Sequence, residues 1–166
     1  MPAITPTANN IMTVSFLFTS DLEKLLMIRK NKGPYPGLLN GIGGKFNGIL
    51  DCRFSGDTDV SQMTRSAWRE INEETSVQDI SYFRWIVTEY FPVGNMPPWG
   101  TDDRKIELWV FCGIINEKDV RQMEDEQLVW IETKKLYVED NLDHLAGDGN
   151  IPYFVNIALK YLKGIQ

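Results

Sequence analysis

The alternation of apolar and polar side chains predicts strands in the first part of this chain. Apolar side chains recur at every second position at Met12, Val14, Phe16 and Phe18. Apart from Leu17, the residues between them are smaller or polar, which is typical of a half-buried strand. Residues 21–24 then fit a turn and residues 25–28 a second strand, so a hairpin is the simplest interpretation.

The strongest helix pattern covers residues 61–75. Met63, Ala67 and Ile71 recur at i, i+4 and i+8, which places one buried stripe along a helix. Before this helix, residues 31–48 are dense in Gly, Pro and Asn, and they predict a loop with one short strand.

The second half of the chain alternates strand and loop patterns and ends in an amphipathic helix. The predicted strands are residues 81–93, 105–115 and 128–131, the predicted loop is 94–103, and the predicted helices are 119–126 and 150–162. This order predicts an α/β (α+β) fold in which a mixed sheet lies between helices. The length fits a single domain over residues 1–166, and we expect the polar residues 1–10 to be flexible.

Composition and charge exclude several classes of function. The net charge is −6 and the 17 Lys and Arg residues are scattered, so no extended nucleic-acid surface is expected. No apolar stretch is long enough to cross a bilayer, and residues 1–10 do not resemble a signal peptide. Cys52 and Cys112 are too few for a disulfide framework, and Cys112 fits a core position, so we expect a reducing cytoplasm.

An acidic protein can still bind a phosphorylated small molecule through a divalent cation, which directs attention to clustered carboxylates.

Three glutamates share one face near the end of the predicted long helix. Glu70, Glu73 and Glu74 stand at i, i+3 and i+4, and the first and last of them fall close to the apolar stripe. Their repulsion, about a few tenths of a kcal/mol per pair, would be relieved partly by Arg69 and more fully by a hard cation. A Glu-rich helix end that is simply solvated is the alternative.

A glycine-rich turn upstream changes this picture. Asn40-Gly41-Ile42-Gly43-Gly44-Lys45 contains a glycine pair, which lets the backbone approach another group closely and can expose a carbonyl to a metal. Together with the glutamates it resembles the Nudix signature, Gly-x5-Glu-x7-Arg-Glu-U-x-Glu-Glu-x-Gly-U, where U is a bulky aliphatic residue. The matching residues are Gly44, Arg69, Glu70, Ile71, Glu73, Glu74 and Val77. The resemblance implies a Nudix-type α/β/α sandwich with a catalytic helix and a C-terminal helix.

The chain departs from this signature in two places. Gly44 and Arg69 are 25 steps apart, 11 more than the 14 of the signature, and we assign the insertion to residues 46–60. The first Glu of the signature, mostly a structural residue in the family, has no clear counterpart, and Ser61, Asp57 and Asp59 are the substitutes considered. Ser76 replaces the last Gly of the signature, which ends the helix in the family.

The resemblance also implies roles for these residues. The implied ligands of Mg²⁺, with Mn²⁺ as the alternative, are the side chains of Glu70, Glu73 and Glu74 and the main-chain carbonyl of Gly44. Arg69 would orient a catalytic glutamate through a salt bridge. Family members often supply a further carboxylate from the loop before a late strand, and here Glu126 is the first choice and Glu124 the second. For either residue alone, a solvated acidic loop is an equally good interpretation.

Three further residues could touch a nucleotide substrate, namely Asn40, Lys45 and Asn150. The Asn-Gly-x-Gly-Gly-Lys form is similar to that of MutT-type enzymes, which hydrolyse oxidised purine triphosphates, and an Asn matching Asn40 can touch the base there. The run that starts at Asn150 resembles another base-contacting Asn-x-Pro, although we favour Asn150 as a cap of the last helix. Lys45 could meet phosphate or remain solvated.

The leading hypothesis is therefore Mg²⁺-dependent attack of water at the phosphorus of a nucleoside diphosphate-linked or triphosphate substrate. A purine triphosphate, oxidised or not, would give nucleoside monophosphate and pyrophosphate. Alternative substrates are an NDP-sugar, a dinucleoside polyphosphate or an RNA cap. A non-catalytic Nudix-fold module that binds a nucleotide is the alternative from another class, and the three crowded carboxylates argue against it because a pure binder has little need of them.

Overall fold

The computed structural model of the protein describes residues 10–31, 37–47, 51, 58–94, 102–137 and 150–165. The strands are β1 (Asn10–Phe18), β2 (Lys24–Arg29), β3 (Leu39–Asn40), β4 (Ile42–Lys45), β5 (Ser81–Gly94), β6 (Asp102–Ile114) and β7 (Gln127–Glu132). The helices are α1 (Asp59–Thr75) and α3 (Asn150–Gly164), with two short 3-10 turns, η1 (Glu117–Asp119) and η2 (Thr133–Tyr137). Most of the predicted insertion and of the predicted flexible residues 1–10 lies outside the described residues.

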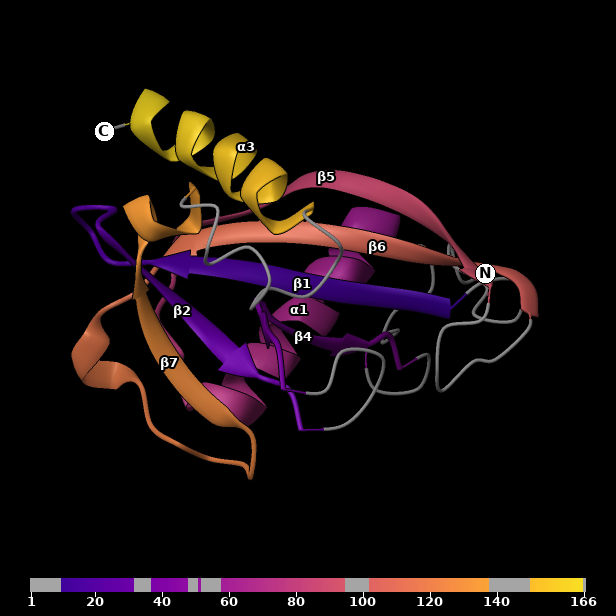
Figure 1. Ribbon diagram of the computed structural model, residues 1–166, viewed down its shortest axis with the longest axis horizontal. Coiled ribbons are helices and arrows are strands. Elements are labelled where there is room, and N and C mark those ends of the chain that lie inside the picture. The colour runs from indigo at the N-terminus through magenta and orange to yellow at the C-terminus, as the bar shows by residue number, and fades with distance from the viewer. Residues whose placement is uncertain are drawn as a thin grey trace.

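All seven strands join one mixed sheet, which confirms the predicted fold class (Figure 1). The main path of the sheet runs β3-β2-β1-β6-β5, while β4 pairs with β1 and β7 with β2. β1 is parallel to β6, and the other pairings are antiparallel. The predicted hairpin of β1 and β2 forms, and the two strands then diverge to different neighbours, β4 and β7. β4 therefore lies beside the first part of β1, where it contacts α1.

One helix covers each face of the sheet (Figure 1). On the α3 side, Phe16 of β1 packs in a cluster with Phe154 and Val155. On the α1 side, Leu17 packs in a cluster with Ile71. The prediction of a half-buried β1 is therefore wrong, because both faces of this strand are covered and even its small polar side chains are buried. The described helices include none that is long and apolar enough to cross a membrane.

The predicted long helix forms, and it begins two residues early. Thr58 caps α1, since its hydroxyl accepts a hydrogen bond from the Ser61 backbone at 3.1 Å. α1 ends at Thr75, and Ser76 takes a left-handed conformation with φ 61°, the conformation that the glycine of the signature would favour.

Two local predictions are wrong. The glycine-rich segment before α1 holds two short strands, β3 and β4, where one was expected. The predicted helix at residues 119–126 does not form, because η1 ends at Asp119 and the chain then runs irregularly to β7. This irregular stretch carries Glu124 and Glu126 to the edge of the candidate site.

Candidate active site on helix α1

The three glutamates of α1 lie as the helical period predicts. Glu74 continues the buried stripe and is only 6% exposed, whereas the side chain of Glu73 is 45% exposed. Glu70 lies between these extremes, with its side chain 14% exposed. The apolar face of α1 thus becomes acidic in its last turns, inside the protein rather than at its surface.

Gly44 of β4 and Glu70 of α1 are in contact. A Cβ atom added to Gly44 would lie 2.5 Å from both Cδ and Oε1 of Glu70, closer than real Cβ atoms come. Only glycine leaves room for the carboxylate at this point of the strand. The structure therefore brings together the two halves of the motif that are far apart in the sequence.

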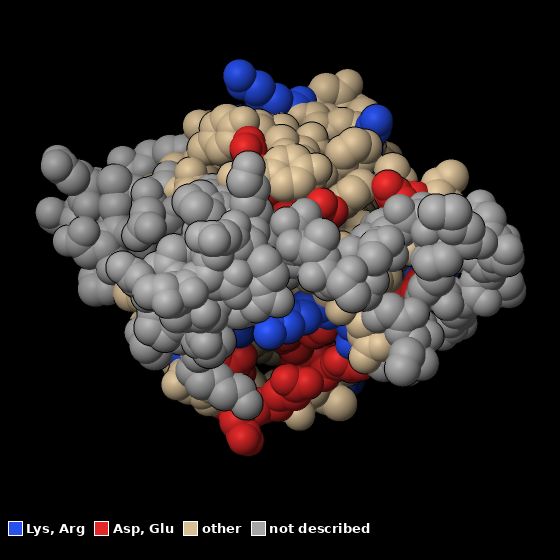
Figure 2. Space-filling model, turned by 90° about the vertical axis from the view of Figure 1, so that its right-hand side faces the viewer, with Lys and Arg blue, Asp and Glu red and all other residues tan. Residues whose placement is uncertain are grey.

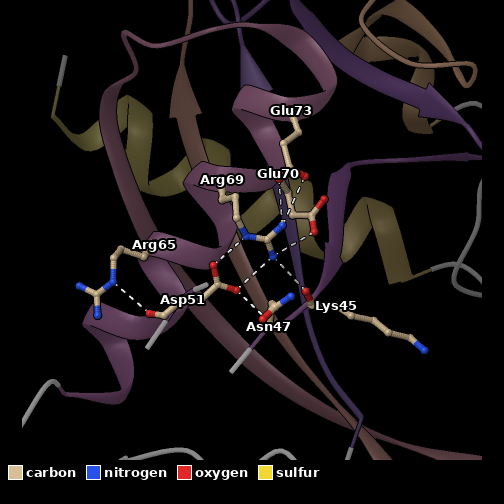
Figure 3. Close-up of polar contacts among 7 residues, drawn as sticks. All are labelled: Lys45, Asn47, Asp51, Arg65, Arg69, Glu70 and Glu73. Atoms are coloured by element: carbon tan, nitrogen blue, oxygen red, sulfur yellow. Dashed lines mark hydrogen bonds and ion pairs between the residues drawn. The ribbon is translucent and has the colours of Figure 1, made fainter. Parts of the chain in front are cut away.

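Arg69 is the centre of a polar network around this contact (Figure 3). Its guanidinium donates from Nε to Asp51 Oδ1 at 2.7 Å and from Nη2 to Asp51 Oδ2 at 3.1 Å. Nη1 lies 3.3 Å from both carboxylate oxygens of Glu73, and Nη2 lies 3.3 Å from Glu70 Oε1. The hydrogen bonds to Asp51 and the neighbouring carboxylates raise the pKa of Arg69, so the side chain is a permanent cation. Nη2 also donates to the carbonyl of Lys45 at 3.3 Å, which ties α1 to the end of β4.

Asp51 was missed from the sequence, and it fills the place that the first Glu of the signature leaves open. It is 1% exposed and is held by the Asn47 N–H at 2.8 Å and, through its own carbonyl, by Arg65 Nε at 3.0 Å. Neither of the two described substitutes takes this place. Asp59 is exposed in the first turn of α1, and the backbone N–H of Ser61 donates to the Thr58 cap. Asp57 lies outside the described residues.

The sequence did carry a weak signal for Asp51. It stands seven steps after Gly44, one more than in the signature, so nearly all the extra length falls between Asp51 and Arg69. Counting back eight residues from Arg69, as the signature spacing requires, leads to Ser61 and misses Asp51.

Burial and like charges raise the affinity of two carboxylates for protons. Desolvation, followed by the charge of Glu70, raises the pKa of Glu74 to about 8, and Lys30 opposes this shift. Desolvation also raises the pKa of Glu70, while Arg69 lowers it. Glu74 Oε2 is buried without a hydrogen-bond partner among the described residues. A buried oxygen of this kind is costly unless a proton or a cation satisfies it.

The loop before β7 adds further carboxylates to the same region. Glu126 accepts hydrogen bonds from Lys30 Nζ at 3.1 Å and from the Asn31 N–H at 2.8 Å, and its side chain is only 12% exposed. Glu124 is exposed, yet its charge, like that of Glu126, contributes to the raised pKa of Glu74. The interpretation of Glu126 as a solvated loop residue is therefore wrong.

The three residues predicted to touch substrate lie at the edges of this region. Asn40 ends β3, and its Oδ1 accepts from the Gly41 N–H at 2.8 Å. Lys45 ends β4, and its side chain points away from Arg69 (Figure 3). Asn150 is the first residue of α3, one place further into the helix than a cap. Their contact with a substrate stays a prediction.

Acidic side chains gather on one part of the molecular surface, with basic side chains beside them in a hollow (Figure 2). Within the described residues, no group of three or more His, Cys, Asp and Glu side chains is arranged so that it could hold a metal ion. The physical reason is local: Glu70 and Glu73 are turned towards Arg69, the cation nearest to them.

Comparisons with known proteins bear on the fold. No protein-family model matches the chain. No curated protein sequence matches it either. Among solved structures, the NUDIX domain of Shewanella oneidensis NrtR complexed with ADP ribose is 17% identical, with a TM-score of 0.67 over 94% of this chain and 90% of that chain. The chain spans only 62% of the NrtR structure complexed with a 27mer DNA.

Two further solved structures are similar over nearly their whole length. The dihydroneopterin triphosphate pyrophosphohydrolase of E. coli is 13% identical, with a TM-score of 0.62 over 93% of this chain and 99% of that chain. A MutT protein from Methanosarcina mazei Go1 is 18% identical, with a TM-score of 0.56 over 98% of this chain and 99% of that chain. These likenesses show that the chain has the Nudix fold, as its motif predicts. Fold alone does not establish an activity.

Proposed function

We propose that the protein is a Nudix-type pyrophosphohydrolase, which uses Mg²⁺ to cleave the phosphoanhydride bond of a small nucleotide. The observation that carries the proposal is the buried Glu74 carboxylate beside Glu70. Glu74 Oε2 is buried there with no hydrogen-bond partner among the described residues. Two structural neighbours are named with pyrophosphate-containing small molecules, a dihydroneopterin triphosphate pyrophosphohydrolase and a domain complexed with ADP ribose.

The residues present fit a divalent cation by their chemistry. Mg²⁺ prefers oxygen ligands, and Glu70, Glu73 and Glu74 offer them close to the carbonyl-bearing Gly44. Arg69 occupies two of these carboxylates in the structure, and we expect it to release at least one when the cation binds. When bound, the cation neutralises phosphate charge and makes water a stronger nucleophile at neutral pH.

The remaining roles belong to the protein's own groups. Asp51 fixes the Arg69 guanidinium, which in turn orients the glutamates. Glu126 is our choice for the group that takes a proton from the attacking water, because Lys30 and the Asn31 N–H hold its carboxylate in place. Water adds to phosphorus as the bridging P–O bond breaks, so a triphosphate gives a nucleoside monophosphate and pyrophosphate, and the water's proton passes to the base.

The first test is hydrolysis of a nucleotide panel with and without Mg²⁺, with the products separated and identified by ion-exchange chromatography. Release of pyrophosphate alone would report only the triphosphates, because cleavage of ADP-ribose gives AMP and ribose 5-phosphate. The panel holds ordinary and oxidised dNTPs, ADP-ribose, a dinucleoside polyphosphate and capped RNA. We expect Glu74→Gln and Glu73→Gln to lower turnover by about 100-fold or more. Glu132→Gln, a change at an exposed glutamate at the end of β7, is the matched control and should leave turnover unchanged.

A nucleotide-binding module without catalysis is the second candidate. It is favoured by the salt bridges of Glu70 and Glu73 with Arg69, which hold both carboxylates in the structure. Folded protein that binds nucleotide but hydrolyses no member of the panel in Mg²⁺ would overturn the hydrolase proposal and support this module. Unchanged activity in both glutamine variants would defeat the proposed cation site.

A further inference from the structure

The outer edge of β7 is covered by a side chain in place of a strand. β7 pairs with β2 along one side, with Leu128 opposite Ile28. The Leu128 N–H points away from β2 and donates to Gln122 Oε1 at 3.0 Å, while Gln122 Nε2 donates to the Glu126 carbonyl at 2.5 Å. A carboxamide has the donor and acceptor of a peptide group, so Gln122 pairs with this edge as one residue of a further strand would.

The same carboxamide also holds the other end of the acidic loop. Gln122 Nε2 donates to the Glu124 carbonyl at 2.6 Å, in addition to its bond to the Glu126 carbonyl. A primary amide has two N–H donors, and Gln122 directs both at this loop. One side chain therefore bridges three successive residues that all carry negative charge, Glu124, Asp125 and Glu126.

Such a loop needs external support. Adjacent carboxylates repel one another, and the backbone here has neither helix nor strand pairing before Gln127. On the site side, Lys30 and the Asn31 N–H hold the Glu126 carboxylate. On the outer side, Gln122 holds the backbone of the same residue, so the orientation of Glu126 is fixed from two directions.

We propose that Gln122 is a positioning residue, which holds the Glu124–Glu126 loop so that the Glu126 carboxylate keeps its contacts with Lys30 and the Asn31 N–H. The inference rests on the proposed function, and it adds a residue that neither touches substrate nor belongs to the signature. Glutamine suits this position because a glutamate would set a negative charge against two carbonyl oxygens. Asparagine is one methylene shorter and would not span the same three groups.

The three hydrogen bonds of the Gln122 carboxamide, to Glu124, Glu126 and Leu128, form a clamp on the loop. This clamp is tested by amide hydrogen exchange, which does not depend on enzymatic activity. Gln122→Met keeps the length of the side chain and removes its donors and its acceptor. We expect the Leu128 amide to exchange about tenfold faster in this variant, as for the loss of one hydrogen bond. Gln127→Met, a change at an exposed glutamine on β7, is the matched control and should leave that rate unchanged. An unchanged Leu128 rate in Gln122→Met would overturn the clamp.

The positioning role is tested by kinetics in two backgrounds. We expect Gln122→Met to lower kcat by about 10- to 100-fold with little change in KM, because Glu126 acts on the reacting water and not on substrate binding. In a Glu126→Gln background the same change should cost nothing further, since the group it positions has gone. Equal losses in both backgrounds would overturn the role. A wild-type protein that hydrolyses nothing would overturn the proposed function and the positioning role, while the exchange rate would still decide whether Gln122 holds the loop.

Discussion

Asp51 and Arg69 face each other across two parallel hydrogen bonds, one from Nε at 2.7 Å and one from Nη2 at 3.1 Å. Paired contacts of this kind fix the plane of a guanidinium as well as its position. The plane matters because the remaining N–H groups of Arg69 then point at Glu70 and Glu73. A residue outside the helix thus controls how the carboxylates of the helix are presented.

Replacing Asp51 should destabilise the protein more than replacing any exposed acid nearby. Asp51→Asn leaves Arg69 without its buried counter-ion, and breaking a buried pair costs about 3 kcal/mol or more. The control Asp59→Asn removes an exposed charge at the start of α1, where we expect less than about 1 kcal/mol. Urea unfolding of both variants measures the difference, and equal losses would contradict the role of Asp51.

Alanine substitutions at the two neighbouring glycines of β4 should have different effects, one on turnover and the other on stability. A Cβ at Gly44 would meet the end of the flexible Glu70 side chain, so Gly44→Ala should stay folded and lose about 10- to 100-fold in turnover. A Cβ at Gly43 would run into the backbone of Thr13, which cannot move aside, so Gly43→Ala should lower the unfolding temperature. Melting curves and rates for the pair separate the two effects. Normal turnover in Gly44→Ala would show that the Glu70 contact has no role in the site.

The stability of the metal-free protein should fall as pH rises. The pKa of Glu74 is raised to about 8 in the folded protein from 4.5, so the folded state keeps a proton that the unfolded chain releases. The resulting stabilisation is complete below about pH 4.5 and is lost as pH rises through 8, roughly a few kcal/mol in all. Unfolding in EDTA across this range should show the slope, and Glu74→Gln should flatten it. A slope that persists in the variant would assign it to another group.

Mg²⁺ should stabilise the protein more at high pH than at low pH. Carboxylates bind the cation only when deprotonated. The pKa values of Glu70 and Glu74 are both raised, so at low pH these residues keep protons that compete with the cation. At a Mg²⁺ concentration 100 times Kd, stabilisation reaches about 2.7 kcal/mol. Thermal melts at pH 8 and pH 5.5, with NaCl matched for ionic strength, measure the difference. An equal shift at both values would argue against these carboxylates as ligands.

Much of this fold follows from local periodicity. Met63, Ala67 and Ile71 predicted α1 and, with it, the burial of Glu74 two turns from the middle of the stripe. The alternation from Met12 to Phe18 predicted β1, but it wrongly predicted that one face of the strand is exposed. Thr13 and Ser15 are polar, and they are buried because α1 lies over them, a fact of tertiary packing that a two-residue period does not contain.

The parts of the site that the sequence could not predict depend on contacts between distant segments. Asp51 and Arg69 are 18 residues apart, and spacing along the sequence does not reveal that their side chains meet. The stretch from Arg121 to Glu126 has polar residues suited to a helix end, and it stays irregular. Gln122 binds its own following backbone there, in competition with helical hydrogen bonds.

The attachment of Asp51 to α1 has a consequence for how this chain can vary. Arg65 and Arg69 fasten Asp51 to the helix, and Thr58 fixes the start of the same helix, so both ends of the intervening segment are anchored to one rigid body. Doubling the length of a loop between fixed ends adds only about 0.6 kcal/mol of closure entropy. A change in the number of residues between Asp51 and Thr58 should therefore leave the carboxylates of α1 in their places.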